Sequence, residues 1–152
     1  MLPARSFLCP AMRNQSGVAA IEFAIMTPLL LLIIASVTEL GLATRDSLRA
    51  QAAAAAGSQY AMLNGNDASG ISDAVVNGTG AVGLRASPAP VLFCGCPVAT
   101  GIGVTACTTT CADGIKARQY ITVSASIDRT SVIDTNLGLP TVLTRQSIAR
   151  LP

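Results

Sequence analysis

The chain of 152 residues contains no histidine and no tryptophan, and it has only two tyrosines and three phenylalanines. Histidine is the commonest general base in enzymes and the commonest metal ligand, so its absence argues against an enzyme and against a cofactor. Lysine occurs once, and the arginines are dispersed. Because nucleic-acid-binding proteins carry a clustered basic surface, nucleic acid is not expected as a partner.

One long apolar run dominates the chain. Phe23–Thr38 carries no charged residue, and with its flanks from Val18 to Ala43 it exceeds the ~20 residues that span the hydrocarbon core of a bilayer. We therefore predict a single membrane-spanning helix, with membrane lipid as its surroundings.

Charges on either side of the run indicate its orientation. Arg5 and Arg13 precede it with no acid nearby, which predicts a cytoplasmic N-terminus and an exported C-terminal part. Arg45 and Arg49 on the far side weaken this bias. The sequence does not distinguish Met1 from Met12 as the translation start.

Glu22 is an acid inside the apolar segment, near its N-terminal end. An ionisable side chain at mid-membrane costs about 2.5–3.5 kcal/mol on insertion scales and marks a functional position with a partner. Ala19, Ala20 and Ala24 are small enough to let another helix approach closely. Pro28 removes a helix hydrogen bond and predicts a kink or a local loosening.

Glu39 lies at the outer end of the predicted span. We expect its carboxylate to be solvated at the interface. The alternative is a contact with another subunit, which would add Glu39 to the helix–helix assembly residues.

Gly17, followed after four residues by Glu22-Phe23 and a hydrophobic helix, resembles the type IV prepilin signal. The wider stretch, roughly residues 13–63, resembles the N-terminal helix of TadE-like pseudopilins of the bacterial Flp/Tad (tight adherence) pilus system. The Pro-Leu-Leu-Leu run and Glu39-Leu40-Gly41 also fall where that family's pattern places them. Further on, the resemblance is a weaker pattern at Tyr120–Val123 and in a final strand ending in Arg.

The resemblance implies cleavage by a membrane-embedded prepilin peptidase after Gly17, with Val18 as the new N-terminus and Glu22 and Phe23 as mature residues five and six. The α-amine of Val18, in the same chain or a neighbour, would then be the natural partner of the Glu22 carboxylate one helical turn away. The alternative is an ordinary anchor whose Glu22 sits at the headgroup level. Other implied partners are pilins or pseudopilins and the Tad assembly-platform proteins.

The helix is expected to continue beyond the membrane to about Leu63, because good helix formers follow the apolar run. Gly57 is a weak point within it. A thin apolar stripe is expected to pack on the exported domain, formed by Leu48, Ala52, Ala55 and Gln59.

The remaining chain predicts a small α+β domain. Ser69 is expected to cap a short helix at Gly70–Val76, and Gly78–Pro90 and Asp128–Leu139 are expected to be connections. Alternation puts Ile121, Val123, Ala125 and Ile127 on one face of a strand. The strands are predicted near Val91–Phe93, near Val104, at Tyr120–Ile127 and at Thr141–Ala149.

Four cysteines in the exported part predict two disulfides. The set is Cys94, Cys96, Cys107 and Cys111. Cys94 and Cys96 are too close to pair without strain, which leaves the connectivities 94–111 with 96–107 and 94–107 with 96–111. A four-thiolate zinc site is the alternative.

Together these features predict an α+β protein with a long transmembrane and projecting N-terminal helix and a small disulfide-stapled antiparallel β domain. Residues 1–17 would be a leader peptide, 18–63 the helix, and 64–152 the exported, periplasmic domain. The expected function is non-catalytic: assembly or priming of Flp/Tad-type pili, with entry into the fibre left open. The alternative is a tethered exported domain that binds an envelope ligand or supports a secretion complex.

Overall fold

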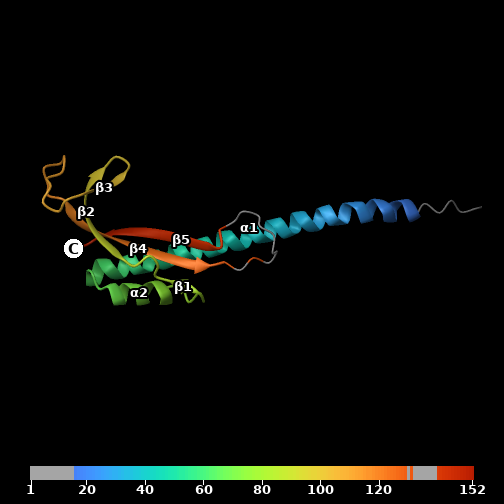
Figure 1. The fold of residues 1–152 in the computed structure, drawn as a ribbon, viewed down its shortest axis with the longest axis horizontal. Helices are drawn as coiled ribbons and strands as arrows, with labels where there is room; N and C mark the ends of the chain where they lie inside the picture. The colour runs from blue at the N-terminus through green and yellow to red at the C-terminus, as the bar shows by residue number, and fades with distance from the viewer. Residues whose placement is uncertain (1–15, 130, 132–139) are drawn as a thin grey trace, which may run out of the picture. The chain divides into compact units, whose positions relative to one another are not determined.

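A computed structural model describes residues 16–129, 131 and 140–152 (Figure 1). Its elements are α1 (Ser16–Asn64), α2 (Ala68–Asn77), β1 (Leu84–Arg85), β2 (Val91–Val98), β3 (Gly101–Thr105), β4 (Arg118–Asp128) and β5 (Val142–Arg150). The predicted α+β class is confirmed: a long apolar N-terminal helix precedes an antiparallel sheet with two disulfides. The chain divides into two compact units, with the boundary after Thr38 inside α1.

Helix α1 is 49 residues long. It contains Pro28, which lies in the first of the two compact units. The proline does not end the helix. One turn is supported by the hydroxyl of Thr27, which donates to the carbonyl of Phe23 at 2.6 Å. The Ser36 and Thr38 hydroxyls bond in the same way to carbonyls four residues earlier. Such back-bonding satisfies hydroxyl groups along an apolar helix.

Strand β4 organises the sheet. It pairs along its length with β5, from Tyr120 opposite Arg150 to Asp128 opposite Val142. On its other edge it pairs with β2 at one end and with β1 at the other. The hairpin of β2 and β3 completes the sheet, and every pairing is antiparallel.

The core lies between β4 and the two helices. Ile121, Val123 and Ala125 are fully buried and Ile127 is 4% exposed, so the predicted face of this strand is confirmed. Figure 1 shows β4 and β5 running beside the later part of α1. The residues that the helices contribute to this core are Ala50, Ala53, Ala54, Ala61, Ile71 and Val75.

The predicted packing stripe of α1 is wrong. Leu48 is 66% exposed, and Ala52 and Gln59 are also exposed. The helix is instead rotated so that Gly57 faces the core. A Cβ atom at Gly57 would lie 2.5 Å from Val75 Cγ2 and 2.8 Å from Val123 Cγ1, so only glycine fits this close approach.

Two hydroxyl contacts tie the same helix to β5. Arg145 Nε donates to Ser47 Oγ at 2.9 Å, and the Ser147 hydroxyl donates to Ser58 Oγ at 3.0 Å. Ser58 is 5% exposed, so its hydroxyl needs the partners that it has.

Helix α2 begins earlier than predicted, and its cap is Asp67 rather than Ser69. The Asp67 carboxylate accepts from the Gly70 backbone N–H at 3.2 Å, and the Ser69 hydroxyl also donates to it at 2.8 Å. β1 lies within the predicted connection Gly78–Pro90. Most of the predicted connection Asp128–Leu139 lies outside the described residues.

Candidate functional site

The first unit presents an exposed apolar helix surface. Its large apolar side chains between Val18 and Val37 are from 51% to 71% exposed, the extremes being Ile33 and Phe23. Among the described residues, α1 is the one helix long and apolar enough to cross a membrane, and none of its most apolar window is buried. Because exposed apolar surface on this scale needs a non-aqueous surrounding or a partner, this segment is the candidate site.

The residues of the predicted prepilin signal lie at the start of this helix. Gly17, Val18, Glu22 and Phe23 are all helical and exposed, as are Ala19, Ala20 and Ala24. Val18 and Glu22 are four residues apart in an α-helix and therefore share a face. Glu22 lies in a shallow pocket whose other lining residues are Ala19, Phe23, Ile25 and Met26.

The pocket combines a carboxylate with small and apolar neighbours. Ala19 leaves space on one side of Glu22, and Phe23 and Met26 supply apolar walls. Such a surface can take a cationic group at the carboxylate and an apolar side chain beside it. The cleavage and assembly roles of these residues remain predictions.

Glu39 is not solvated, contrary to expectation. Glu39 is only 1% exposed. Its Oε2 accepts a hydrogen bond from Arg129 Nη2 at 2.9 Å, and its Oε1 accepts one from the Ser131 hydroxyl at 2.9 Å. Burial with hydrogen-bonded partners explains how an acid is accommodated at the start of the second unit. A contact of Glu39 with another subunit remains a prediction.

Arg129, the cationic partner of Glu39, is a site residue that the sequence analysis did not predict. It directly follows β4, and its backbone N–H donates to the Thr141 carbonyl at 2.7 Å, just before β5. Its side chain is 5% exposed, and its Nη1 has no hydrogen-bond partner within the described part of the chain. An isolated arginine immediately after a buried strand was the available signal.

The four cysteines form two disulfides, Cys94–Cys107 and Cys96–Cys111. This is one of the two predicted connectivities. The Cα atoms are 5.1 and 5.5 Å apart, within the usual range for a disulfide. A four-thiolate zinc site would need these sulfurs unbonded.

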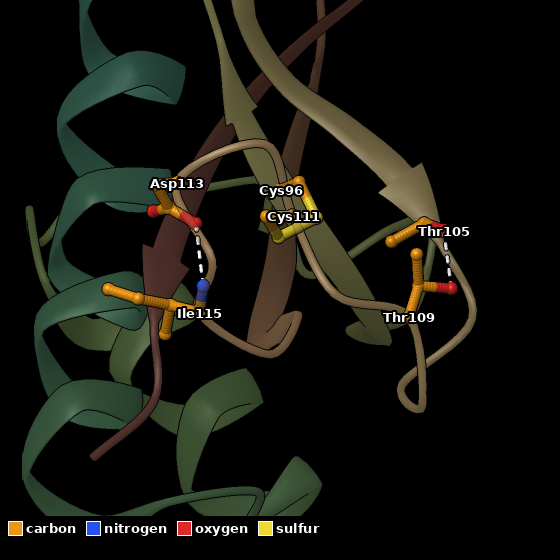
Figure 2. Close-up of a disulfide and its surroundings, with 6 residues drawn as sticks. All are labelled: Cys96, Thr105, Thr109, Cys111, Asp113 and Ile115. Carbon is orange, nitrogen blue, oxygen red and sulfur yellow. Dashed lines mark hydrogen bonds between the residues drawn. A yellow bond between two sulfur atoms is a disulfide. The ribbon is translucent and has the colours of Figure 1, made fainter.

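The disulfides fasten the loop before β4 to strand β2, as Figure 2 shows for Cys96 and Cys111. The loop is also held by its own hydrogen bonds. The Ile115 N–H donates to Asp113 Oδ1 at 3.0 Å, and the Thr105 hydroxyl donates to Thr109 Oγ1 at 3.1 Å. The loop before β4 is thus held against β2, and all four cysteines of this region are disulfide-bonded.

The structure has one candidate membrane span, the exposed apolar helix ahead of the disulfide-linked sheet, and this arrangement fits a membrane-anchored protein. Residues 17–59 match the family model described as TadE-like protein. The family indicated by Gly17, Glu22-Phe23 and the following helix is thereby confirmed over this segment. The sheet and its disulfides lie beyond the match. Comparisons with curated proteins and with solved structures found no match.

Proposed function

We propose that this protein is a non-catalytic, membrane-anchored subunit that assembles or primes Flp/Tad-type pili after prepilin-peptidase cleavage following Gly17. One observation carries the proposal: the TadE-like match at residues 17–59 coincides with a helix whose apolar surface and single acid, Glu22, are exposed in the first unit. TadE-like proteins are associated with pili, not with catalysis.

Cleavage after Gly17 creates an ammonium group at Val18, and that group neutralises a Glu22 carboxylate. The two are one turn apart within a chain, and the exposed carboxylate is equally accessible to the amine of a neighbouring helix. Pairing offsets the cost of an acid in lipid, so the charge becomes a contact between subunits.

Neighbouring helices approach at the small residues. Ala19, Ala20 and Ala24 flank Glu22 and are exposed, which permits the close backbone contact that membrane helix pairs favour. The partners in this proposal are lipid of the bacterial inner membrane, the prepilin peptidase, other pilins or pseudopilins, and the Tad assembly platform. The N-terminus is cytoplasmic and the sheet domain periplasmic.

N-terminal sequencing of the mature protein tests the processing step. In cells with the peptidase, the wild type is expected to begin at Val18, whereas Gly17→Leu remains full length. Gly41→Leu is the matched control, because a Cβ atom meets nothing within 4 Å at either glycine. An uncleaved wild type would count against processing, and normal surface pili after deletion of the gene would count against the assembly role.

Cross-linking from position 24, which leaves Glu22 intact, tests the assembly contact. Capture of a pilin or pseudopilin from this position is expected, and Glu22→Gln should abolish it.

A second candidate function is a tethered periplasmic domain that binds an envelope ligand, which the sheet domain favours because it lies outside the family match. Persistent full-length protein in the inner membrane without pilin contact would support that alternative.

A further inference from the structure

A groove on α1 begins just beyond the uncharged run that ends at Thr38, and the proposed function does not use it. It lies within the second unit and has a volume of about 520 Å³. Its lining residues are Gly41, Thr44, Arg45, Leu48, Arg49 and Ala52 from α1, and Thr79 from the turn after α2.

The groove exists because the turn after α2 lies directly on α1. A Cβ atom at Gly78 would lie 2.6 Å from Ala56 Cβ, so glycine lets the two backbones come together. This contact brings Thr79 beside Ala52, one turn earlier along α1. The Thr79 Oγ1 is buried there and has no hydrogen-bond partner in the described ranges. Because a buried hydroxyl is normally satisfied, this atom indicates a ligand.

Most of the surface of the groove is apolar, and two of its lining residues, Arg45 and Arg49, give it an excess of positive charge. Arg45 is exposed, and the Arg49 side chain is 38% exposed. Asp46 is the neighbouring acid, and its Oδ1 is 3.8 Å from Arg49 Nη1, a loose contact that leaves most guanidinium donors of both arginines available. The adjacent Leu48 is 66% exposed and gives the groove an apolar wall.

We propose that this groove binds the phosphodiester headgroup of an anionic phospholipid from the leaflet at the C-terminal end of the span. Arg45 and Arg49 would hold the phosphate oxygens, the Thr79 hydroxyl would donate to one of them, and Leu48 would contact the glycerol and upper acyl chains. Guanidinium groups are suited to phosphate, and arginines close to a membrane attract anionic lipid.

The groove follows closely on the uncharged run in the sequence, and this position favours a lipid over a free phosphate as its ligand. Gly41, the first lining residue, is only three positions beyond the uncharged run that ends at Thr38. A groove at that point in the helix meets headgroups as soon as the preceding segment is in a bilayer. The proposal rests on the membrane anchoring in the proposed function, but not on cleavage or on pilus assembly.

Native mass spectrometry of the full chain, released from mixed phosphatidylcholine and phosphatidylglycerol nanodiscs, tests the proposal. The wild type is expected to retain phosphatidylglycerol, and Arg45→Gln/Arg49→Gln is expected to retain it at least fivefold less. The matched control is Lys116→Gln/Arg150→Gln, which removes two exposed positive charges elsewhere in the second unit. Thr79→Val is expected to reduce retention at least twofold.

The outcomes separate the explanations. Equal losses in both double variants would overturn the site in favour of general electrostatic attraction. Full displacement of the lipid by millimolar glycerol phosphate would overturn the lipid in favour of a free anion. If the wild type does not co-sediment with membranes, the anchoring itself fails, and the proposed function fails with it. Unchanged Tm values in the variants confirm that they fold.

Discussion

Glu39 and Arg129 are joined across 90 positions of sequence by a contact of 2.9 Å between Oε2 and Nη2, and their side chains are 1% and 5% exposed. The neighbouring residue, Asp128, forms a second ion pair with Arg85. That pair is open to solvent, with side chains 57% and 59% exposed. Two ion pairs from adjacent positions at the end of β4 therefore differ mainly in burial.

Removing one partner of the buried pair is expected to be costly. Arg129→Met should lower the free energy of unfolding by about 3–5 kcal/mol, because it leaves the Glu39 carboxylate buried without its cation. Arg85→Met should lower it by less than about 1 kcal/mol, because water screens the exposed pair. Denaturant unfolding of the full chain in detergent, followed by circular dichroism, measures both.

A double variant distinguishes pairing from packing. Glu39→Leu/Arg129→Met removes both charges and should recover most of the stability that Arg129→Met loses. Equal losses for Arg129→Met and Arg85→Met would contradict the importance of burial at this site.

Gly57 should be intolerant of a methyl group. Gly57→Ala is expected to lower stability, because the new Cβ overlaps Val75 and Val123 at a cost of about 1–3 kcal/mol. Alanine gains roughly 1 kcal/mol over glycine in a helix interior, so the net loss should be up to about 2 kcal/mol. Gly41→Ala is the control, since a Cβ there meets nothing within 4 Å, and it should not lower the Tm. A Gly57→Ala protein as stable as wild type would refute the close approach.

Paired cysteine substitutions should reveal the connectivity. Cys94→Ser/Cys107→Ser removes one bridge and should lower stability by about 3 kcal/mol, with Cys96 and Cys111 still protected from alkylation. Cys94→Ser/Cys111→Ser separates both pairs, so two additional thiols should react and the loss should be larger. Mass spectrometry after alkylation counts the thiols. Protection in the second variant and reactivity in the first would support the crossed pairing.

Acid should weaken the cap of α2. The hydroxyl of Ser69, the N–H of Gly70 and the hydroxyl of Tyr60 donate to Asp67 and hold its pKa below the ordinary value of 3.8. Because the folded pKa is lower than the unfolded one, the stabilisation is complete above pH 3.8 and is lost as the pH falls through the folded pKa. Stability measured from pH 6 to pH 2 should therefore decline more in wild type than in Asp67→Asn.

The hydrogen bond between Tyr60 and Asp67 should also make the stability depend on pH in the alkaline range. The hydrogen bond from Tyr60 to Asp67 is the largest cause that raises the pKa of the Tyr60 phenol above 10.0. Its stabilisation is present below pH 10 and is lost as the pH rises through the folded pKa. Tyr60→Phe should remove this alkaline loss, and an identical alkaline profile in both proteins would argue against the contact.

The regular elements could be predicted because their patterns are strong. The apolar and alanine-rich residues of α1 favour helix over its whole length, and alternation in Tyr120–Ile127 identified β4 and its buried face. The candidate membrane segment followed from the same hydropathy. The Gly17 and Glu22-Phe23 motif added the resemblance to TadE-like proteins, which the match confirms over residues 17–59.

The features that could not be predicted are those that the local sequence does not determine. A run of alanines has no periodicity of hydrophobicity, so nothing local showed that Ala50, Ala53 and Gly57 would face the sheet instead of Leu48. The partnership of Glu39 with Arg129 depends on a tertiary contact that no local pattern reports. The two crosswise disulfide pairings close loops of similar length, and only the fold distinguishes them.

The buried face of α1 has a consequence for how the helix is located along its own axis. Alanine and glycine form a smooth surface without the projecting side chains that normally lock two elements by interdigitation. The exception is Gly57, where Val75 and Val123 approach so closely that an alanine moved into its place would overlap them. The axial position of the helix is therefore set by this one glycine together with the polar contacts to the strand ends and β5, which are Glu39 with Arg129, Ser47 with Arg145, and Ser58 with Ser147.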